Sequence, residues 1–571
     1  MTSRLSSRET LEINVGLIGV GVVGSAVLDF FARQPLELRG PGARLGGPAS
    51  AQVRLWSAAR RSRHNPKGAP QALIERAVSR DGDGRARFFY DTDPDGASRA
   101  APPDGPAWRK IVRDEHVDIV VEVTGSPVAE AIIEEALWEG KCVVTANKAV
   151  LSRTGYELVK LARSRGTVLA YEAAVGGGMP VVQTIGSAIG GRVTGILAIL
   201  NGTTNFILSE MRKAGASEAA YPAAVCAAIH GGLAEADPGA DVLGEDARSK
   251  IIILAGLAFG VRLRPRDVYL RGLARRGIAT APGPADRAAY HACASGSGEP
   301  CREICGSDDH VSTRPMFQAA DLEMLDRLGY VPKLLAGAQS ALTDGAGRPH
   351  EVVAWVQPAA VPLDHPLAKV HGSDNACLLE VESPTPGGGG APAKGYTIAL
   401  QGPGAGGPET ASSIIADIQF CARQLAVAGR SPSGGGPDCP REPLYMYGAG
   451  AFSQPQPYRG APALCRRGDL VAPFLLRFVK GPGLDADAVA AALARHGVKP
   501  TPIEAASPDN LYIRTEPASI CTMELGLEAV LRELGPRKAP LDILYLPVLE
   551  GARWATAGGH DAGASGQATR Q

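Results

Sequence analysis

Short apolar runs alternate with stretches of helical spacing over the first 150 residues. The runs at 13–18, 53–57, 118–123 and 142–145 are largely apolar on both sides, as in strands buried within a parallel sheet. Residues 25–33 and 127–139 have the spacing of amphipathic helices. The alternation of strands and helices predicts an α/β fold with a doubly wound sheet over residues 1–150.

A further helical pattern begins at Asp246 and is strongly apolar from Ile251 onward. Asp246 and Lys250 are four residues apart, so their side chains leave one face of the helix in consecutive turns. Such spacing usually produces a surface ion pair. A second carboxylate upstream, Glu235, and the apolar helix that follows favour a pair that is buried and bound to something.

The region before this helix contains N-G-T-T-N at 201–205. We expect a close-packed turn there, with hydroxyl and amide donors that include Thr203.

The C-terminal pattern is strand, helix, two strands, helix and strand. These elements are expected at 470–479, 486–496, 501–505, 510–516, 523–534 and 543–549. The order predicts a βαββαβ module. The last residues, 551–571, are small and polar and predict a disordered tail.

The clearest ligand signal is a glycine pattern directly after the first predicted strand. It has the form G-x-G-x-x-G and comprises Gly19, Val20, Gly21, Val22, Val23 and Gly24. The first glycine permits a tight turn, the second a close approach to a pyrophosphate, and the third close packing of helix on strand. In this strand–turn–helix context the pattern predicts a Rossmann-type site for a dinucleotide.

The residues after the second predicted strand bear on which dinucleotide binds. An NAD site usually has a carboxylate at this place, whereas this chain has Arg60 in a basic stretch. A guanidinium suits a 2′-phosphate, so NADP is favoured and NAD stays possible; the alternative is a solvated basic loop. Thr124 and Lys148 follow later strands and are expected near the nicotinamide.

Composition narrows the function classes. The 571 residues carry no formal net charge, so nucleic acid and anionic membranes are not expected as partners. No apolar run is long enough to span a bilayer, and the ten cysteines are scattered, so we expect a cytoplasmic protein without a disulfide framework. Cys293, Cys301 and Cys305 lie close together, but a plain insertion loop is favoured over a metal site.

Compositional shifts suggest the domain limits. We expect a dinucleotide-binding domain at 1–150, which a returning segment at 401–425 completes. A substrate and dimerisation domain is expected at 151–400, with insertions at 280–315 and 383–395. After it we expect a linker at 426–468, the βαββαβ module at 469–550 and the tail.

Taken together, these blocks resemble the homoserine dehydrogenases in order and spacing. The matching blocks are the glycine pattern, V-E-V-T-G at 121–125, A-N-K at 146–148, E-A-A-V-G-G-G at 172–178, L-N-G-T-T-N-F-I-L at 200–208 and G-L-A-E-A-D-P at 232–238 with D-A-R-S-K at 246–250. The resemblance covers about residues 13–425 apart from the insertions. No aspartate kinase module precedes them, so the likeness is to the monofunctional form.

The resemblance implies interconversion of L-homoserine and L-aspartate 4-semialdehyde with a nicotinamide cofactor. Lys250 is the candidate for proton transfer and Lys148 its rival, and the sequence does not rank them. Asp246 would bind the reacting or polar end of the substrate, and Glu235 its ammonium. The remaining residues carried over are Gly232 and Thr203 at the substrate, and Gly232, Gly404 and Gly406 at the cofactor.

A monovalent cation, sodium or potassium, is also implied. It would be held by Glu172 and by carbonyl groups of Val175, Gly177 and Met179. From the residues alone, the same stretch is a tight turn with a bystander carboxylate.

The C-terminal module resembles an ACT regulatory domain, with threonine as the expected effector and a homodimer or homotetramer as the expected assembly. A ligandless module that only mediates association is the alternative. For the whole chain, the alternatives are another two-domain semialdehyde reductase and a non-catalytic nucleotide or amino-acid sensor. A phosphorylating aldehyde dehydrogenase would need a nucleophilic cysteine, and the matched substrate blocks contain none.

Overall fold

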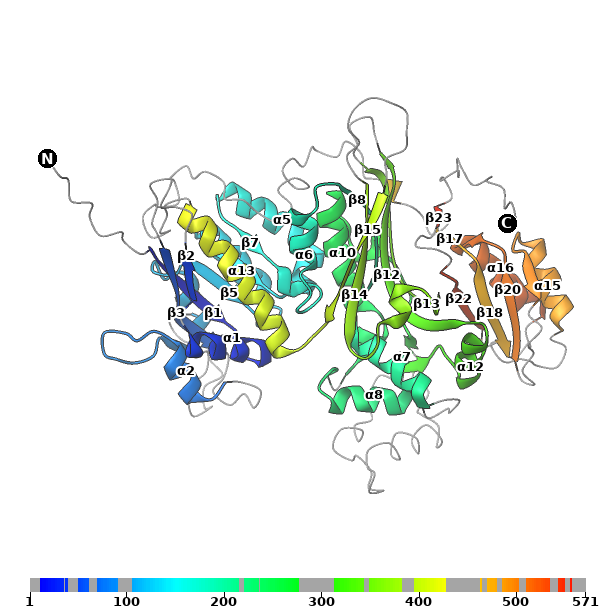
Figure 1. Cartoon of the computed structure of the whole chain (residues 1–571), viewed down its shortest axis with the longest axis horizontal. Coiled ribbons are helices and arrows are strands. Elements are labelled where there is room, and N and C mark those ends of the chain that lie inside the picture. The colour runs from blue at the N-terminus through cyan, green and yellow to red at the C-terminus, as the bar shows by residue number, and fades with distance from the viewer. Residues whose placement is uncertain are drawn as a thin grey trace, which may run out of the picture. The chain divides into compact units, whose positions relative to one another are not determined.

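The computed structural model describes most of the chain (Figure 1). The described residues are 11–34, 36–39, 50–60, 69–90, 105–214, 220–235, 237–276, 313–343, 349–382, 395–427, 463–464, 470–479, 485–502, 510–534, 543–549 and 555–556. The group of Cys293, Cys301 and Cys305, the inner parts of both expected insertions and most of the expected linker lie outside these residues.

The chain forms two compact units. The first consists of Met1–Gly190, Ile252–Pro265 and Gly402–Pro455, and the second of Gly191–Ile251, Arg266–Gln401 and Gln456–Gln571. The division falls inside helix α10 (Glu245–Phe259) and strand β15 (Gly395–Pro403).

The first unit is built on a seven-stranded sheet with the order β2-β3-β1-β5-β6-β7, in which β4 also pairs with β3. Its strands are β1 (Leu11–Ile18), β2 (Leu36–Arg39), β3 (Ser50–Arg60), β4 (Phe88–Tyr90), β5 (Ile119–Glu122), β6 (Cys142–Thr145) and β7 (Leu169–Ala170). All pairs are parallel except β2 with β3. This order confirms the predicted doubly wound domain, whose switch point lies between β1 and β5.

Helices surround this sheet. They are α1 (Val22–Arg33), α2 (Gln71–Ala77), α3 (Ala107–Val112), α4 (Ala129–Trp138), α5 (Lys148–Ser164), η2 (Glu172–Ala174), α6 (Val181–Gln183), η3 (Thr184–Ala188) and α13 (Gly407–Val427). The late helix α13, yellow in Figure 1, packs against α1 and against β3, β5 and β6. A segment about 400 residues downstream therefore shares the core of the first strands.

Two details of the first unit differ from the sequence-based expectation. The second predicted strand is longer, since β3 runs on to Arg60, and Arg60 ends the strand instead of following it. The edge strand β2 was not predicted; it pairs antiparallel with the first residues of β3 and lies close to the glycine- and proline-rich stretch at 40–48.

The second unit holds a seven-stranded sheet with the order β15-β14-β8-β12-β13-β16, to which β9 adds beside β13. Its strands are β8 (Arg192–Ile199), β9 (Tyr269–Leu270), β12 (Tyr330–Thr343), β13 (Pro349–Pro362), β14 (Asp374–Glu382), β15 and β16 (Ala463–Leu464), with a separate pair β10 (Ala274–Arg276) and β11 (Thr313–Pro315). The helices are α7 (Gly202–Ala214), α8 (Ala220–His230), α9 (Gly239–Val242), the start of α10, η4 (Pro265–Asp267), α12 (Ala319–Arg327) and η5 (Pro366–Lys369).

The C-terminal residues form a four-stranded antiparallel sheet in the order β19-β20-β18-β22. Its elements are β18 (Phe474–Val479), α15 (Ala486–Arg495), β19 (Pro500–Pro502), β20 (Asn510–Thr515), α16 (Ile520–Leu534) and β22 (Ile543–Pro547). This is the predicted βαββαβ order.

Two expectations for the C-terminal region were wrong. The first strand is divided at Pro473 into β17 (Leu470–Ala472) and β18, because proline supplies no N–H to a ladder. In the expected disordered tail, β23 (Ala555–Thr556) pairs with β17, while β21 (Ala518–Ser519) pairs with the other edge of β17.

Buried apolar residues of the large sheet and of the C-terminal module form one continuous cluster. It includes Leu335 and Trp355 from the large sheet and Phe474, Leu493 and Met523 from the module. The module is therefore joined to the sheet by a shared core.

Candidate functional site

The glycine pattern has the geometry that its spacing predicts. Gly19 has a φ of +103°, and a Cβ there would lie 2.8 Å from the carbonyl of Val123. A Cβ on Gly24 would lie 2.0 Å from the oxygen of Gly19. A Cβ on Gly21 would meet nothing within 4 Å, so the face of this residue is open. Two of the glycines are thus required for packing, and the third leaves space for a ligand.

The N-terminus of α1 is available to an anion. Gly21 caps the helix without a side chain, and no acidic residue stands in its first turn. The first backbone N–H groups of a helix have no partner inside it and carry a partial positive charge. Val20 is buried, Val22 is exposed, and Val23 continues the first turn, so backbone groups rather than side chains face a ligand here.

A buried carboxylate, Glu122, organises the ends of two neighbouring strands. Its Oε1 accepts hydrogen bonds from the backbone N–H and the hydroxyl of Thr124, each at 2.7 Å. Its Oε2 accepts from the hydroxyl of Thr145 at 2.8 Å. Thr145 accepts in turn from the N–H of Asn147, and Asn147 caps α5, whose first residue is Lys148. Glu122 therefore fixes both Thr124 and the start of the helix that carries Lys148.

Glu122 was not among the site residues predicted from the sequence, although it lies in the V-E-V-T-G block. A carboxylate inside an otherwise apolar strand is the signal that could have revealed it, because a buried charge requires partners.

Arg60 lies at the carboxyl end of β3, next to the end of β1. Its guanidinium donates to the carbonyl of Ala69 at 3.2 Å and lies over the rings of Phe88 and Tyr90, 5.8 and 5.4 Å from their centroids. Arg60 therefore belongs to the structured end of β3 and does not lie in a solvated loop. The basic residues at 61–63 lie outside the described residues.

The segment with Gly404 and Gly406 returns to the glycine pattern. A Cβ on Gly407 would lie 2.9 Å from a methyl group of Val22, and one on Gly177 would lie 2.7 Å from the backbone of Gly404. The N–H of Gly178 donates to the carbonyl of Pro403 at 3.1 Å. The start of α1, the returning segment and the glycine turn at 176–178 thus meet at one place in the first unit.

Glu172 begins the turn proposed for a cation and is 1% exposed. Its two carboxylate oxygens accept from the backbone N–H groups of Val182 at 2.9 Å and Gln183 at 2.7 Å. Burial raises the pKa of this carboxyl to about 7, and the amide hydrogen bonds oppose that shift only in part. No basic side chain pairs with Glu172 in the part of the chain that the structure describes.

The other groups proposed for the cation belong to the same turn. Gly176 and Gly177 have φ values of +85° and +59°, which favour glycine. The carbonyl of Gly177 already accepts from the hydroxyl of Ser413 at 2.6 Å, and that of Met179 from the N–H of Val181 at 2.8 Å. Because a carbonyl oxygen has two lone pairs, both keep one for a further partner. The carbonyl of Val175 follows directly after η2.

Asp246 and Lys250 form a buried ion pair at the start of α10, with 2.8 Å between Oδ2 and Nζ. Their side chains are 6% and 9% exposed. Lys250 also donates to the carbonyl of Leu200 at 2.7 Å. The alternative of a surface ion pair is therefore wrong: two charges are held out of water, which is costly unless they are paired and hydrogen-bonded, as these two are.

Asn201 supports this pair from the beginning of α7. Its Nδ2 donates to Asp246 at 2.9 Å and to Asp241 at 2.6 Å, and its Oδ1 accepts from the N–H of Thr204 at 2.8 Å. The last bond makes Asn201 the cap of α7, so the residues after it form the first helical turn. The close-packed turn expected at 201–205 is instead the cap and first turn of a helix, because a side-chain cap here offsets the low helix propensity of glycine and threonine.

The remaining substrate candidates lie close to α7. The hydroxyl of Thr203 donates to the carbonyl of Leu233 at 2.9 Å, which fixes the segment that carries Gly232 and Glu235. Gly232 has a φ of +70°, and no atom lies within 4 Å of a Cβ built there. Glu235 is exposed and makes no hydrogen bond or ion pair within the described residues. A solvent-facing carboxylate on a fixed turn is able to accept a cationic group from a ligand.

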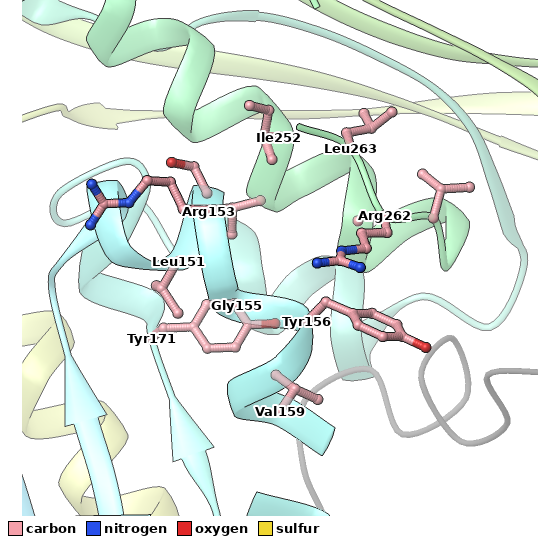
Figure 2. A pocket seen from close by; sticks show the side chains of 13 residues that line it. Leu151, Arg153, Gly155, Tyr156, Val159, Tyr171, Ile252, Arg262 and Leu263 are labelled. Atoms are coloured by element: carbon pink, nitrogen blue, oxygen red, sulfur yellow. The ribbon is translucent and has the colours of Figure 1, made fainter. Parts of the chain in front are cut away.

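The hollow in Figure 2 does not belong to this set. It lies in the first unit between α5 and the second half of α10, has a volume of about 50 Å³ and is lined by Leu151, Val159, Ile252 and other mainly apolar residues. It contains no residue predicted for the cofactor or the substrate. We assign it to helix packing.

In the described parts of the chain, no three His, Cys, Asp or Glu residues are grouped as a metal site built from side chains requires. Among the described helices, none combines the length and the apolar character needed to cross a membrane.

Comparison with known proteins decides the family. The sequence model described as "Homoserine dehydrogenase, NAD binding domain" matches residues 19–172, and the one described as "Homoserine dehydrogenase" matches residues 180–419. Homoserine dehydrogenase of Corynebacterium glutamicum is 31% identical over 422 residues, which are 74% of this chain and 74% of that protein. The chain belongs to the homoserine dehydrogenase family. The resemblance inferred from the sequence blocks is thus confirmed.

Other relatives match over a shorter length. Homoserine dehydrogenase of Mycobacterium tuberculosis (strain H37Rv) is 38% identical over 326 residues, 57% of this chain and 61% of that protein. The chain thus spans less than two thirds of the length of this relative. The solved homoserine dehydrogenase of Thiobacillus denitrificans has a TM-score of 0.66 at 24% identity and covers 95% of this chain and 100% of its own. This likeness supports the fold of the homoserine dehydrogenase family.

Proposed function

We propose that this chain is a homoserine dehydrogenase that interconverts L-homoserine and L-aspartate 4-semialdehyde with a nicotinamide cofactor. The observation that carries the proposal is the buried pair of Asp246 and Lys250, held by Asn201 within the second family-matching region. A sensor that had lost catalysis would gain nothing from two buried charges at this place.

The roles of the residues follow from the chemistry of the reaction. When bound, the nicotinamide supplies or accepts the hydride. In aldehyde reduction Lys250 gives a proton to the oxygen that becomes the hydroxyl, and it takes the proton back in the reverse direction. Asp246 orients the ammonium of Lys250 and the polar end of the substrate. Glu235 pairs with the substrate ammonium, a role that agrees with its exposed carboxylate.

Lys148 stays the rival for proton transfer. Its helix start is fixed through Glu122, Thr145 and Asn147, as a residue beside a cofactor requires. The dependence of turnover on pH separates the two lysines when each is substituted in turn. The variant that lacks the proton donor should lose the fall in rate at high pH, whereas the variant that lacks a positioning lysine should keep this fall at a lower overall rate.

The finer cofactor assignment is NADP. Arg60 would bind the 2′-phosphate from the end of β3, and Gly404 and Gly406 would face the pyrophosphate from the returning segment. Arg60→Ala should weaken NADP binding about ten-fold or more, and NAD binding little, since the guanidinium meets a charge that NAD lacks. Isothermal titration with both dinucleotides measures this, and equal losses would contradict the assignment.

A sodium or potassium ion would be held by Glu172 and the carbonyls of Val175, Gly177 and Met179. The buried carboxylate without a basic partner among the described residues supports it, since a cation would offset the cost of that charge. We further propose that threonine is an effector bound by the ACT-like module. The expected assembly is a homodimer or homotetramer, and the expected location is the cytoplasm.

The test is an assay of the purified chain with L-homoserine and NADP or NAD, followed through the absorbance of the reduced nicotinamide. Lys250→Met should abolish turnover, while Lys499→Met, which removes an exposed ion-paired lysine, should not. The aldehyde-reducing direction is measured in parallel. No reaction in either direction with a cofactor that binds would overturn the proposed function.

A further inference from the structure

The second unit contains a hollow of about 410 Å³ whose lining includes none of the residues assigned to cofactor and substrate. It is formed by the last turns of α7, the start of β12, η5 and the residues just after η5. Four of the side chains that line it are basic: Arg212, Lys213, Lys333 and His371. The volume is far above the roughly 30 Å³ share of one water molecule, so a polyatomic ligand has room.

Lys333 is the most unusual of these basic residues because it is only 3% exposed. Its ammonium donates to Oδ1 of Asn205 at 2.8 Å and to the carbonyl of Val370. Both acceptors are neutral, and no carboxylate pairs with Lys333 in the described part of the chain. A buried charge without a counter-charge is costly, so an anion supplied from outside would be stabilised here.

The pKa of Lys333 agrees with this picture. Burial, and then the charge of Arg212, lower the pKa of Lys333 to about 8, which leaves the group largely protonated at neutral pH. By contrast, the buried Lys250 has Asp246 beside it.

The other basic residues have partners at the rim. Arg212 pairs with Asp326 at 2.8 Å and Lys213 with Glu210 at 2.7 Å. These carboxylates are 44% and 33% exposed, so water screens them. The carboxylates of Asp326 and Glu210 thus offset part of the positive charge of Arg212 and Lys213, but they do not pair with the ammonium of Lys333.

His371 reports the sign of the local field. Burial lowers the pKa of its imidazole, and the charges of Lys333, Arg212 and Lys213 lower it further. The acidic groups nearby are Asp326 on α12, Glu210 on α7 and Asp374 at the start of β14, whose N–H donates to the carbonyl of His371. The carbonyl end of α7 adds only about half a negative charge. The charges that act on His371 are thus those of three basic residues, and water screens the partly exposed carboxylates of Asp326 and Glu210.

We propose that this hollow binds a small divalent oxyanion of the phosphate class. Lys333 would supply the buried charge, and Arg212, Lys213 and His371 would supply donors from the rim. Inorganic phosphate and the phosphate group of a small ester share this chemistry. The site does not depend on the proposed activity, because its residues are separate from those given to cofactor and substrate.

The first experiment measures thermal unfolding of the full chain against inorganic phosphate, with sodium chloride at equal ionic strength as the control. We expect a saturable rise in Tm with phosphate only. The double variant Lys213→Gln, His371→Gln should lose this rise while it keeps the Tm of the free protein, since both residues are exposed. A rise of the same size with chloride, or an unchanged response of the double variant, would overturn the site.

Two control variants locate the effect. Lys499→Gln removes an exposed lysine of the same unit and should leave the phosphate response unchanged. Arg60→Ala should also retain it, because phosphate that acts at the dinucleotide site would respond to that change instead. Loss of the response in Arg60→Ala with retention in the double variant would place phosphate at the cofactor site and refute the proposal.

A second experiment uses sulfate, which stays divalent over the pH range in which His371 titrates. A bound anion raises the lowered pKa values of both His371 and Lys333, so sulfate should bind more tightly at pH 6 than at pH 8. His371→Gln should reduce this pH dependence, and an unchanged dependence in that variant would contradict the assignment of His371. Glycerol 3-phosphate, measured in parallel, identifies the source: tighter binding than phosphate points to an ester, and weaker binding to the free anion.

Discussion

Two ion pairs in this chain have the same helical spacing and very different surroundings. In α1, Asp29 and Arg33 approach to 2.5 Å with side chains 36% and 72% exposed. In α10, Asp246 and Lys250 approach to 2.8 Å with side chains 6% and 9% exposed. The spacing of four residues brings both pairs together. Burial of the second pair comes from elements far away in the sequence, namely the end of β8 and the start of α7.

The difference in burial changes what each pair can do. An exposed pair of this spacing is worth about 0.3–0.5 kcal/mol, because water and salt screen it. A buried pair offers little net stability, yet loss of one partner leaves a charge that costs about 3–5 kcal/mol. A charge in such a position is strongly oriented, which is the property that proton transfer needs. The exposed pair therefore serves as an internal control for the buried one.

The largest contrast is expected in turnover. Lys250→Met should lower kcat by about 10²–10⁴-fold, the usual contribution of a general acid–base group. Arg33→Met, the matched change in the exposed pair, should leave kcat unchanged. Steady-state rates with homoserine, together with the dissociation constant of the cofactor for each variant, provide the measurement. Equal rates for the two variants would remove Lys250 from the mechanism.

The next contrast concerns stability. Asp246→Asn should lower the free energy of unfolding by about 3 kcal/mol, because the ammonium of Lys250 stays buried with only neutral acceptors. Asp29→Asn should change it by less than about 0.5 kcal/mol. Urea denaturation at two salt concentrations yields both values. If the two substitutions cost the same, burial of Asp246 makes no difference to the energy of its ion pair.

Asn201 sharpens the comparison, since the exposed pair has no such third group in the described structure. Asn201→Asp keeps the acceptor that caps α7 and loses both amide donors to Asp241 and Asp246. We expect near-normal helix content and a loss of turnover of at least about ten-fold. Asn201→Ala should lose the cap as well, at a cost of about 1 kcal/mol. Circular dichroism with parallel kinetics separates the two effects, and full activity of Asn201→Asp would show that orientation by Asn201 is dispensable.

The smallest effect is expected at Glu172, a buried carboxylate that has no basic partner among the described residues. Its pKa is raised to about 7, so the unfolded chain releases this proton first and the free energy of unfolding falls as pH rises from about 4.5 to about 7. A bound cation reverses that loss above pH 7 and does little below pH 5, where the carboxyl is protonated.

The prediction is that sodium or potassium raises Tm at pH 8 by a few degrees over choline at equal ionic strength, and has no such effect at pH 5. Glu172→Gln should remove the dependence on the cation. A cation effect that persists in this variant would place the ion elsewhere.

Sequence alone predicts those features that local chemistry determines. The strand at Cys142–Thr145 and the helix that begins near Asp246 were assigned correctly because continuous apolar runs and helical spacing are local signals. The glycine pattern was also informative by itself, since Gly19 and Gly24 are required for packing and Gly21 leaves space for a ligand. Helix α7 was missed because the glycine and the two threonines after Asn201 have low helix propensity and favour a turn, although Asn201 is itself a preferred cap residue.

Long-range contacts account for what the sequence did not show. Glu122 gained its role from Thr145, which lies 23 residues away, and Lys333 meets Asn205 across 128 residues. The spacing of Asp246 and Lys250 predicted that they meet and left open whether water surrounds them. Burial separates an ordinary ion pair from a reactive one, and burial depends on the packed fold, so the spacing alone could not distinguish the two.

The shared core of the second unit has a consequence for shortening the chain. Arg477 of β18 pairs with Asp321 of α12 at 3.1 Å, with side chains 1% and 2% exposed, and the hydroxyl of Tyr512 donates to Asp321 at 3.0 Å. A product that ended before β18 would leave Asp321 facing water together with an uncovered apolar sheet. Expression of the catalytic portion alone would therefore require redesign of this surface, with Asp321 among the first positions to replace.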